Sequence, residues 1–163
     1  MAALPVLHCN VCLCFSVRDR QGFGDISNEF WLGNNNIHAL TSSTSDVTLR
    51  IEMTDLQDSR WLAQYDSFKV DDESAMYALS IDNFHGNATN ALTYSNGMPF
   101  STSDVDNDVS SQNCAQFYTA GWWYKHCHYA NLNGRFTVGI VWFNHDEDEW
   151  MQMKETVLKI RRN

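Results

Sequence analysis

The sequence has few basic residues and no long apolar run. Eleven Lys and Arg stand against 20 Asp and Glu among 163 residues, which gives a formal net charge of −9. This excess of negative charge argues against nucleic acids and anionic membrane surfaces as partners. No window of 18 consecutive apolar residues occurs, so the sequence predicts no membrane-spanning helix.

The sequence also lacks the common short motifs of catalysis and nucleotide binding. No GxSxG, HExxH, P-loop or GxGxxG pattern is present. Cys127 and His128 are adjacent, and neighbouring side chains rarely face each other as a nucleophile and its base. We therefore expect a protein that binds a ligand and is not an enzyme.

What is present is enough for one folded domain. The length suits a single core, and 44% hydrophobic with 13% aromatic residues is not the composition of a disordered chain. Apolar and polar residues alternate over 47–54, which predicts a half-buried strand, and 61–70 is an aromatic-rich second strand that would form an antiparallel hairpin with it. Further strands are expected at 77–81, 139–143 and 156–160, and short helices at 35–40 and 86–92.

The stretch 95–134 has little periodicity, because Gly, Asn, Ser and Asp interleave with Trp and Tyr. A long irregular segment of this kind needs a metal or a disulfide to hold it. Asp104, Asp106 and Asp108 alternate within it, a pattern that suits Ca²⁺ because this cation takes several oxygen ligands. The EF-hand spacing fails at Val109 and Ala115, so a solvated acidic loop remains the alternative.

Five cysteines cannot all pair within one chain. Cys114 and Cys127 could close a loop of about 14 residues, remain free thiols, or bind zinc together with the neighbouring histidines. Cys9, Cys12 and Cys14 lie in an atypical segment, residues 1–20, which reads either as a poor signal peptide or as a non-native start. Asn87 begins an N-glycosylation sequon that matters only if the chain is secreted.

Several motifs in a fixed order and spacing resemble one known family. They span Gln21 to Arg162 and comprise Glu29–Asn34, Asn96–Thr102, Asp104–Asp108, Asn113–Ala115, Gly121–Tyr124, Cys127–His128, Asn131–Gly134, Gly139–Trp142 and Lys159–Arg161. This order is similar to that of the fibrinogen C-terminal (fibrinogen-related) domain family, which includes fibrinogen chains, ficolins, tachylectins, tenascins and angiopoietins. The resemblance, nearest to the ficolins, tachylectins and tenascins, implies an α+β fold. We expect a small antiparallel sheet, short helices and a long irregular region held by calcium and a disulfide.

The resemblance also implies a set of site residues. Ca²⁺ would be bound by the side chains of Asp106 and Asp108 and by the backbone carbonyls of Ser110 and Gln112. Cys114 would pair with Cys127, after a cis peptide bond between His126 and Cys127. An acetyl-binding pocket would be formed by Tyr118, His128 and the backbone of Cys127, and Phe136 would stand in for a wall that a longer loop usually supplies.

The function implied is that of a secreted, calcium-dependent, lectin-like module that binds acetylated glycans, of the type used in innate immunity. The alternatives are a protein-binding module of the extracellular matrix, adhesion or signalling, and a remnant without a ligand. The family's N-terminal subdomain has no counterpart before Gln21, so we expect 21–163 to be a truncated domain with exposed apolar surface on the sheet over 47–81. The oligomeric state is left open.

Overall fold

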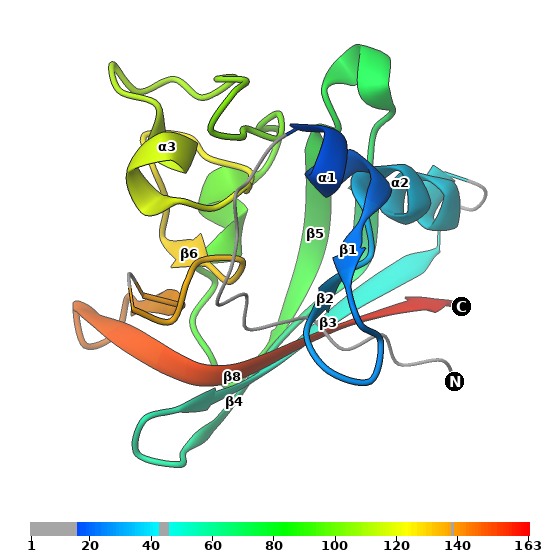
Figure 1. Cartoon of the computed structure of the whole chain (residues 1–163). Helices are drawn as coiled ribbons and strands as arrows, with labels where there is room; N and C mark the ends of the chain where they lie inside the picture. The colour runs from blue at the N-terminus through cyan, green and yellow to red at the C-terminus, as the bar shows by residue number, and fades with distance from the viewer. Residues whose placement is uncertain (1–15, 43–45, 138) are drawn as a thin grey trace.

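A six-stranded antiparallel sheet forms the centre of the computed structural model, which describes residues 16–42, 46–137 and 139–163 (Figure 1). The strand order is β5-β4-β3-β8-β7-β6. The strands are β3 (Val47–Asp55), β4 (Arg60–Val70), β5 (Leu79–Gly86), β6 (Ala130–Asn131), β7 (Val141–Asn144) and β8 (Glu149–Arg162). The predicted hairpin is therefore confirmed as β3 and β4, and the last strand of the chain completes the centre of the sheet beside β3.

Alternation along β3 separates a buried face from a charged one. Leu49 and Ile51 are almost fully buried, and Ile51 lies opposite Ala63 of β4 and Leu158 of β8. Arg50 and Glu52 point to the other face, where Nε of Arg50 lies 2.8 Å from the Glu52 carboxylate. Because the strand period is two, burying one set places the other in solvent.

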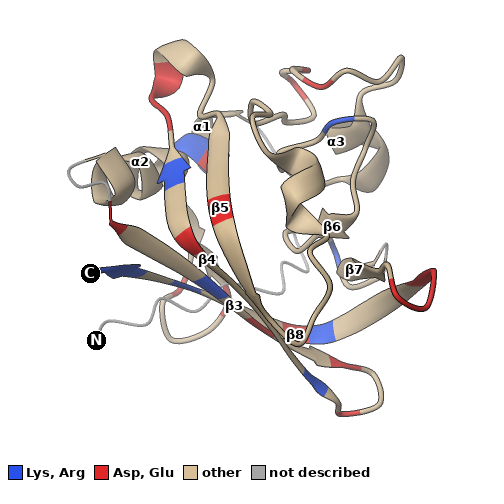
Figure 2. Ribbon diagram, turned by 180° about the vertical axis from the view of Figure 1, so that it is seen from behind, with Lys and Arg blue, Asp and Glu red and all other residues tan. Residues whose placement is uncertain are grey.

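The expectation of exposed apolar surface on this sheet is wrong for the part of the chain that the structure describes. Its large exposed apolar side chains lie in loops, turns, helices and the start of β8, and none belongs to β3, β4 or β5. Charged residues instead mark the outer face, where Glu52 also pairs with Lys159 at 2.7 Å. Figure 2 shows Lys, Arg, Asp and Glu distributed along these strands.

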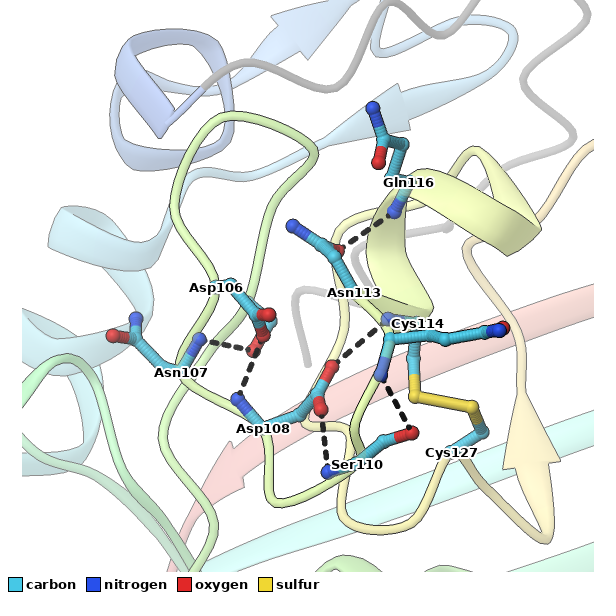
Figure 3. The surroundings of a disulfide bond; sticks show 10 residues. Asp106, Asn107, Asp108, Ser110, Asn113, Cys114, Gln116 and Cys127 are labelled. Atoms are coloured by element: carbon cyan, nitrogen blue, oxygen red, sulfur yellow. Dashed lines mark hydrogen bonds between the residues drawn. A yellow bond between two sulfur atoms is a disulfide. The ribbon is translucent and has the colours of Figure 1, made fainter.

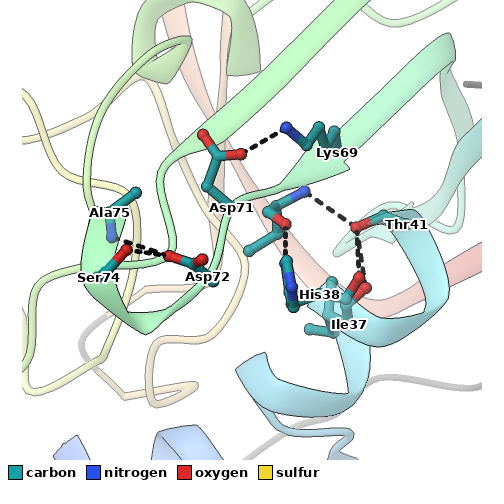
Figure 4. Close-up of polar contacts among 9 residues, drawn as sticks. Ile37, His38, Thr41, Lys69, Asp71, Asp72, Ser74 and Ala75 are labelled. Atoms are coloured by element: carbon teal, nitrogen blue, oxygen red, sulfur yellow. Dashed lines mark hydrogen bonds and ion pairs between the residues drawn. The ribbon is translucent and has the colours of Figure 1, made fainter. Parts of the chain in front are cut away.

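Two helices and a small strand pair precede the main sheet. They are α1 (Ser16–Gln21), β1 (Phe23–Gly24), β2 (Phe30–Trp31) and α2 (Asn34–Ser42). Helix α2 packs against the end of β4. Thr41 Oγ1 accepts a hydrogen bond from the N–H of Val70 at 3.1 Å, and Nδ1 of His38 donates to the carbonyl of Val70 at 2.9 Å (Figure 4). These bonds satisfy a backbone donor and acceptor at the end of β4.

The chain then crosses to β5 through a short 3₁₀ helix, η1 (Glu73–Ala75). Asp72 caps this helix, because its carboxylate accepts hydrogen bonds from the N–H of Ala75 at 3.1 Å and from the hydroxyl of Ser74 at 2.6 Å (Figure 4). This is the ordinary role of an Asp at a helix N-terminus.

The short helix predicted over 86–92 is wrong. Strand β5 continues to Gly86, and the helical turn that follows is a 3₁₀ helix, η2 (Leu92–Ser95). The reason lies in Asn87, whose side chain accepts a hydrogen bond from the N–H of Leu62 at 2.7 Å and donates to the carbonyl of Arg60 at 3.1 Å. The amide thereby continues the ladder beside β4 and keeps the chain extended.

The region after η2 is irregular, as the sequence predicts. Between Ser95 and Gly134 the regular elements are α3 (Cys114–Tyr118) and the two-residue β6. Buried Trp123 anchors this region to the rest of the domain, since its Nε1 donates to the carbonyl of Tyr77 at 2.8 Å. The predicted mixture of a small antiparallel sheet, short helices and one long irregular region is thus confirmed.

Candidate functional site

The three alternating aspartates have different hydrogen-bond partners in the structure. The Asp104 carboxylate accepts hydrogen bonds from the backbone N–H of Ser16 at 2.9 Å and from the hydroxyl of Thr102 at 2.7 Å. It therefore fastens the start of α1 to the loop. Asp106 and Asp108 form a separate pair beside the start of α3 (Figure 3).

Both carboxylate oxygens of Asp108 accept a hydrogen bond from the backbone. One carboxylate oxygen accepts a hydrogen bond from the N–H of Ser110 at 2.8 Å, and the other accepts from the N–H of Cys114 at 2.9 Å. Asp106 accepts from the N–H of Asp108 at 3.2 Å. Burial, together with the negative charge of Asp106, raises the pKa of Asp108. No described Lys or Arg forms an ion pair with either carboxylate.

Two close carboxylates without a basic partner are the donor type that Ca²⁺ prefers. Among the described residues no group of three or more His, Cys, Asp or Glu could hold a metal. A cation at Asp106 and Asp108 would therefore have to take further oxygens from the backbone. Ser110 and Gln112 follow in the same loop, and their coordination of Ca²⁺ stays a prediction.

A disulfide joins this loop to the segment that follows α3. Cys114 and Cys127 are bonded, with their Cα atoms 5.4 Å apart, which is an ordinary separation for a bridge. Cys114 is the first residue of α3, and Asn113 caps the helix by accepting a hydrogen bond from the N–H of Gln116 at 2.8 Å (Figure 3). The predicted pairing is confirmed, whereas Cys9, Cys12 and Cys14 lie outside the described residues.

The expected cis peptide bond between His126 and Cys127 is wrong. No described peptide bond is cis. The chain turns instead at Cys127, which has a left-handed φ of 50°, and the N–H of Lys125 donates to the carbonyl of Cys127 at 2.9 Å. A left-handed residue closed by that hydrogen bond reverses the chain without a cis bond.

His128 follows this turn and lies in an aromatic cluster. Its ring centroid is 4.5 Å from that of Tyr118, 5.9 Å from that of Tyr124 and 5.4 Å from that of Trp150. The residue is 8% exposed, and neither ring nitrogen has a hydrogen-bond partner in the part of the chain described. Burial lowers the pKa of His128 to about 4, so the ring is neutral near pH 7 and offers one donor and one acceptor.

Phe136 is not among the rings that contact His128. It is 38% exposed, and its backbone carbonyl accepts a hydrogen bond from Nε2 of Gln152 at 3.3 Å. The ring that meets His128 from the last hairpin belongs to Trp150, which is 49% exposed. Sequence reasoning missed Trp150, although a Trp directly after an acidic turn is unusual on a surface and was a usable signal.

The remaining predicted residue, Asn87, lies on the surface at the end of β5, away from this cluster in sequence. Both polar atoms of its side-chain amide are hydrogen-bonded to β4. The hydroxyl of Thr89 in the same sequon donates to the carbonyl of Phe143 at 2.7 Å. Glycosylation at Asn87 stays a prediction.

Comparison with known families gives one match over almost the whole chain. The family described as fibrinogen beta and gamma chains, C-terminal globular domain, matches residues 17–163. Among curated proteins, Protein scabrous of Drosophila melanogaster is 41% identical over 142 residues, which is 87% of this chain and 18% of that protein. Tenascin-R of Gallus gallus is 46% identical over 130 residues, which is 77% of this chain and 10% of that protein. The chain thus spans less than a fifth of these relatives.

Solved structures agree with the family match. The fibrinogen-like globe domain of human ANGPTL2 superposes with a TM-score of 0.87 at 33% identity, over 99% of this chain and 79% of that one. Lamprey fibrin D-dimer in complex with the peptide Gly-His-Arg-Pro-amide superposes with a TM-score of 0.83 at 31% identity, over 97% of this chain and 60% of that one. No helix of the described residues is long and apolar enough to cross a membrane.

Proposed function

Because this chain belongs to the family of fibrinogen C-terminal globular domains, we propose that it is a secreted, non-enzymatic recognition module that binds a segment of another extracellular protein. The likeness to tenascin-R and scabrous favours a role of the matrix or signalling type. The peptide complex of lamprey fibrin supports a peptide as ligand. The ligand would bind at the surface formed by Tyr118, His128 and Trp150.

This proposal rests on the burial of the His128 ring without a hydrogen-bond partner among the described residues. A buried polar ring normally has hydrogen-bond partners, because leaving it without one costs free energy. His128 has none among the described residues and is surrounded by aromatic rings, with half-buried Tyr118 beside it. A ligand that supplies a carbonyl or an N–H would satisfy the ring and cover the apolar edges around it.

Calcium would act on this surface through the disulfide. Asp108 accepts from the N–H of Cys114, and Cys114 is bonded to Cys127, which directly precedes His128. A cation bound by Asp106 and Asp108 would neutralise their repulsion and fix the loop that holds Cys114. We therefore propose that Ca²⁺ organises the surface and takes no direct part in contacting the ligand.

An acetylated glycan is the second candidate ligand at the same surface. The half-buried Tyr118 ring beside a neutral His128 would suit a methyl group next to a carbonyl. Burying one methyl contributes about 0.8 kcal/mol and one hydrogen bond contributes about 1 kcal/mol. A single domain would therefore bind an acetyl group only weakly, at millimolar concentrations or above.

The two candidates can be separated with extracellular matrix laid down by cultured cells and then stripped of the cells. The purified domain is applied in Ca²⁺ to untreated matrix, to matrix pretreated with protease, and to matrix in the presence of N-acetylglucosamine or glucose. Tyr118→Ala removes the ring beside His128. The control is Ile26→Ala, which removes an exposed apolar side chain from the β1–β2 turn.

A protein ligand predicts binding that is lost after protease treatment and in Tyr118→Ala, and kept in Ile26→Ala and in both sugars. Competition by N-acetylglucosamine but not by glucose would transfer the assignment to the acetylated glycan. Binding that Tyr118→Ala leaves unchanged would contradict the assignment of this surface for either ligand.

A further inference from the structure

A concave site lies between the β3–β4 turn and the β7–β8 hairpin. It is a groove of about 310 Å³ that is lined by two indoles, Trp61 and Trp150, and by three carboxylates, those of Asp55, Glu147 and Glu149. No described basic residue lines it. Figure 2 shows acidic residues in both turns at the same end of the sheet. We propose that this groove binds an arginine side chain of a partner protein segment.

Trp61 is held in place before any ligand arrives. Its Nε1 donates to the Asp55 carboxylate at 2.8 Å, and the same carboxylate accepts from the N–H groups of Gln57 and Ser59 at 2.9 Å each. Asp55 is 6% exposed. Its oxygens are therefore occupied in shaping the turn and fixing the edge of the indole, so Asp55 positions Trp61 and does not itself pair with the ligand.

Trp150 forms the opposite wall and is supported from behind. Its ring centroid is 5.0 Å from that of Phe143 and 5.4 Å from that of His128. The residue is still 49% exposed, so half of its surface is open to a ligand. Trp150 borders both the groove and the His128 cluster, so the two sites share this residue and otherwise have different linings.

The carboxylates give the groove its preference for a cation. Glu147 accepts a hydrogen bond from Nδ2 of Asn144 at 2.8 Å, which holds it at the hairpin. Neither Glu147 nor Glu149 forms an ion pair with a described basic residue, and the nearby Lys154 of β8 pairs with Asp58. Two carboxylates without an ion-pair partner, in a groove that two indoles also line, are complementary to one positive group.

Arginine fits this lining better than a neutral ligand does. A guanidinium stacks on an aromatic face and is less strongly hydrated than an ammonium, so it gives up less on entering a partly closed groove. The overall charge of −9 would also attract basic segments. A sugar could stack on the indoles and donate hydroxyl hydrogen bonds to the two carboxylates, but it would leave their negative charge uncompensated.

The site can be tested by NMR of ¹⁵N-labelled protein, in which each Trp gives one indole signal that is assigned with single Trp→Phe variants. The probe is the peptide Gly-Ser-Arg-Ser-Gly-amide, and the reference is the same peptide with citrulline, which keeps the shape of arginine without its charge. The test variant is Glu147→Gln with Glu149→Gln. The matched control is Asp146→Asn with Asp148→Asn, which removes the same charge from the same hairpin but from residues that do not line the groove.

We expect the arginine peptide to shift the indole signals of Trp61 and Trp150, with millimolar affinity, and to bind about tenfold more tightly than the citrulline peptide. The Glu147→Gln, Glu149→Gln variant should lose most of this difference, and the matched control should keep it. Equal binding of the two peptides, shifts confined to other Trp residues, or an equal loss in the matched control would each overturn the proposal.

This outcome is independent of the function proposed for the His128 surface. Tyr118→Ala leaves the lining of the groove intact, so it should bind the arginine peptide as the unmodified domain does. If the domain does not bind the matrix but still binds the arginine peptide, the function proposed for the His128 surface fails and the arginine site stands.

Discussion

The sheet and the irregular region between Ser95 and Gly134 are held together by different means. In the sheet, backbone ladders join β3 to β4 and β8, and alternate side chains such as Leu49 and Ile51 fill one continuous core. In the irregular region, one disulfide, carboxylate-capped turns and edge-on contacts between rings take the place of ladders. The sheet therefore carries the stability of the domain, and the irregular region carries the groups that can bind a ligand.

The two regions also differ in the polar and charged groups that they leave without a partner. The described strands pair in ladders, with one shift of register between Thr54 and Asp55, and Arg50, Glu52 and Lys159 on the outer face pair among themselves. Among the residues that the structure describes, Asp106 and Asp108 of the irregular region have no basic partner, and the buried His128 has no hydrogen bond. Such groups cost stability, and this cost is what a ligand or a cation can recover.

The largest effect is expected from a cavity in the sheet. Ile51→Ala removes a fully buried side chain at the centre of β3, and such deletions cost about 2 to 5 kcal/mol. Urea unfolding followed by circular dichroism should show that loss, whereas Arg50→Ala on the outer face should cost less than about 1 kcal/mol. Equal losses in the two variants would contradict the division of the sheet into a core face and a solvent face.

A smaller and more local effect is expected from the disulfide. Replacing Cys114 and Cys127 with Ser opens a loop closed over a sequence separation of 13, which costs about 3 kcal/mol from loop-closure entropy. Hydrogen exchange should rise mainly between residues 101 and 134, and the amides of β3 should stay protected relative to global unfolding. Exchange that rises evenly through the whole chain would show that the two regions unfold as one unit.

Sequence patterns predict the sheet well because its physical cause is local. The alternation over 47–54 can be read directly, and β3 has those bounds within one residue. The helix expected over 86–92 fails because the Asn87 side chain bonds to β4, a contact between residues about 25 positions apart. Tertiary contacts of this kind override local propensity.

The candidate site is predicted only in part, for a related reason. Composition and spacing single out the aspartates and cysteines, and the resemblance adds Tyr118 and His128. Trp150 is missed, because it reaches His128 only through the pairing of β7 with β8. The left-handed conformation of Cys127, found where a cis peptide bond is expected, is missed as well. The pattern of residues does not determine the backbone conformation at one position.

The next effect depends on pH. His128 has a pKa of about 4 in the folded domain and an ordinary value near 6.5 when unfolded, so the unfolded chain takes up a proton first as the pH falls. Stability should be full above pH 6.5 and decline between pH 6.5 and 4, by about 3 kcal/mol at most. His128→Phe should flatten this part of the stability curve, as measured by urea unfolding at a series of pH values. A curve with the same slope in the variant would contradict the burial of a neutral His128.

If the calcium loop, the disulfide and the aromatic cluster form one unit, calcium binding must change the environment of the His128 ring. A titration with Ca²⁺ is followed by the NMR signals of the His128 ring and of the Tyr118 ring, in the unmodified domain and in Asp106→Ala. With a Kd on the order of 10⁻⁴ M, typical of extracellular calcium sites, we predict that both ring signals shift and saturate together with the loop amides, and that Asp106→Ala abolishes every shift. If Ca²⁺ shifts the NMR signals of the loop amides but not those of the two rings, the loop, the disulfide and the aromatic cluster do not form one unit.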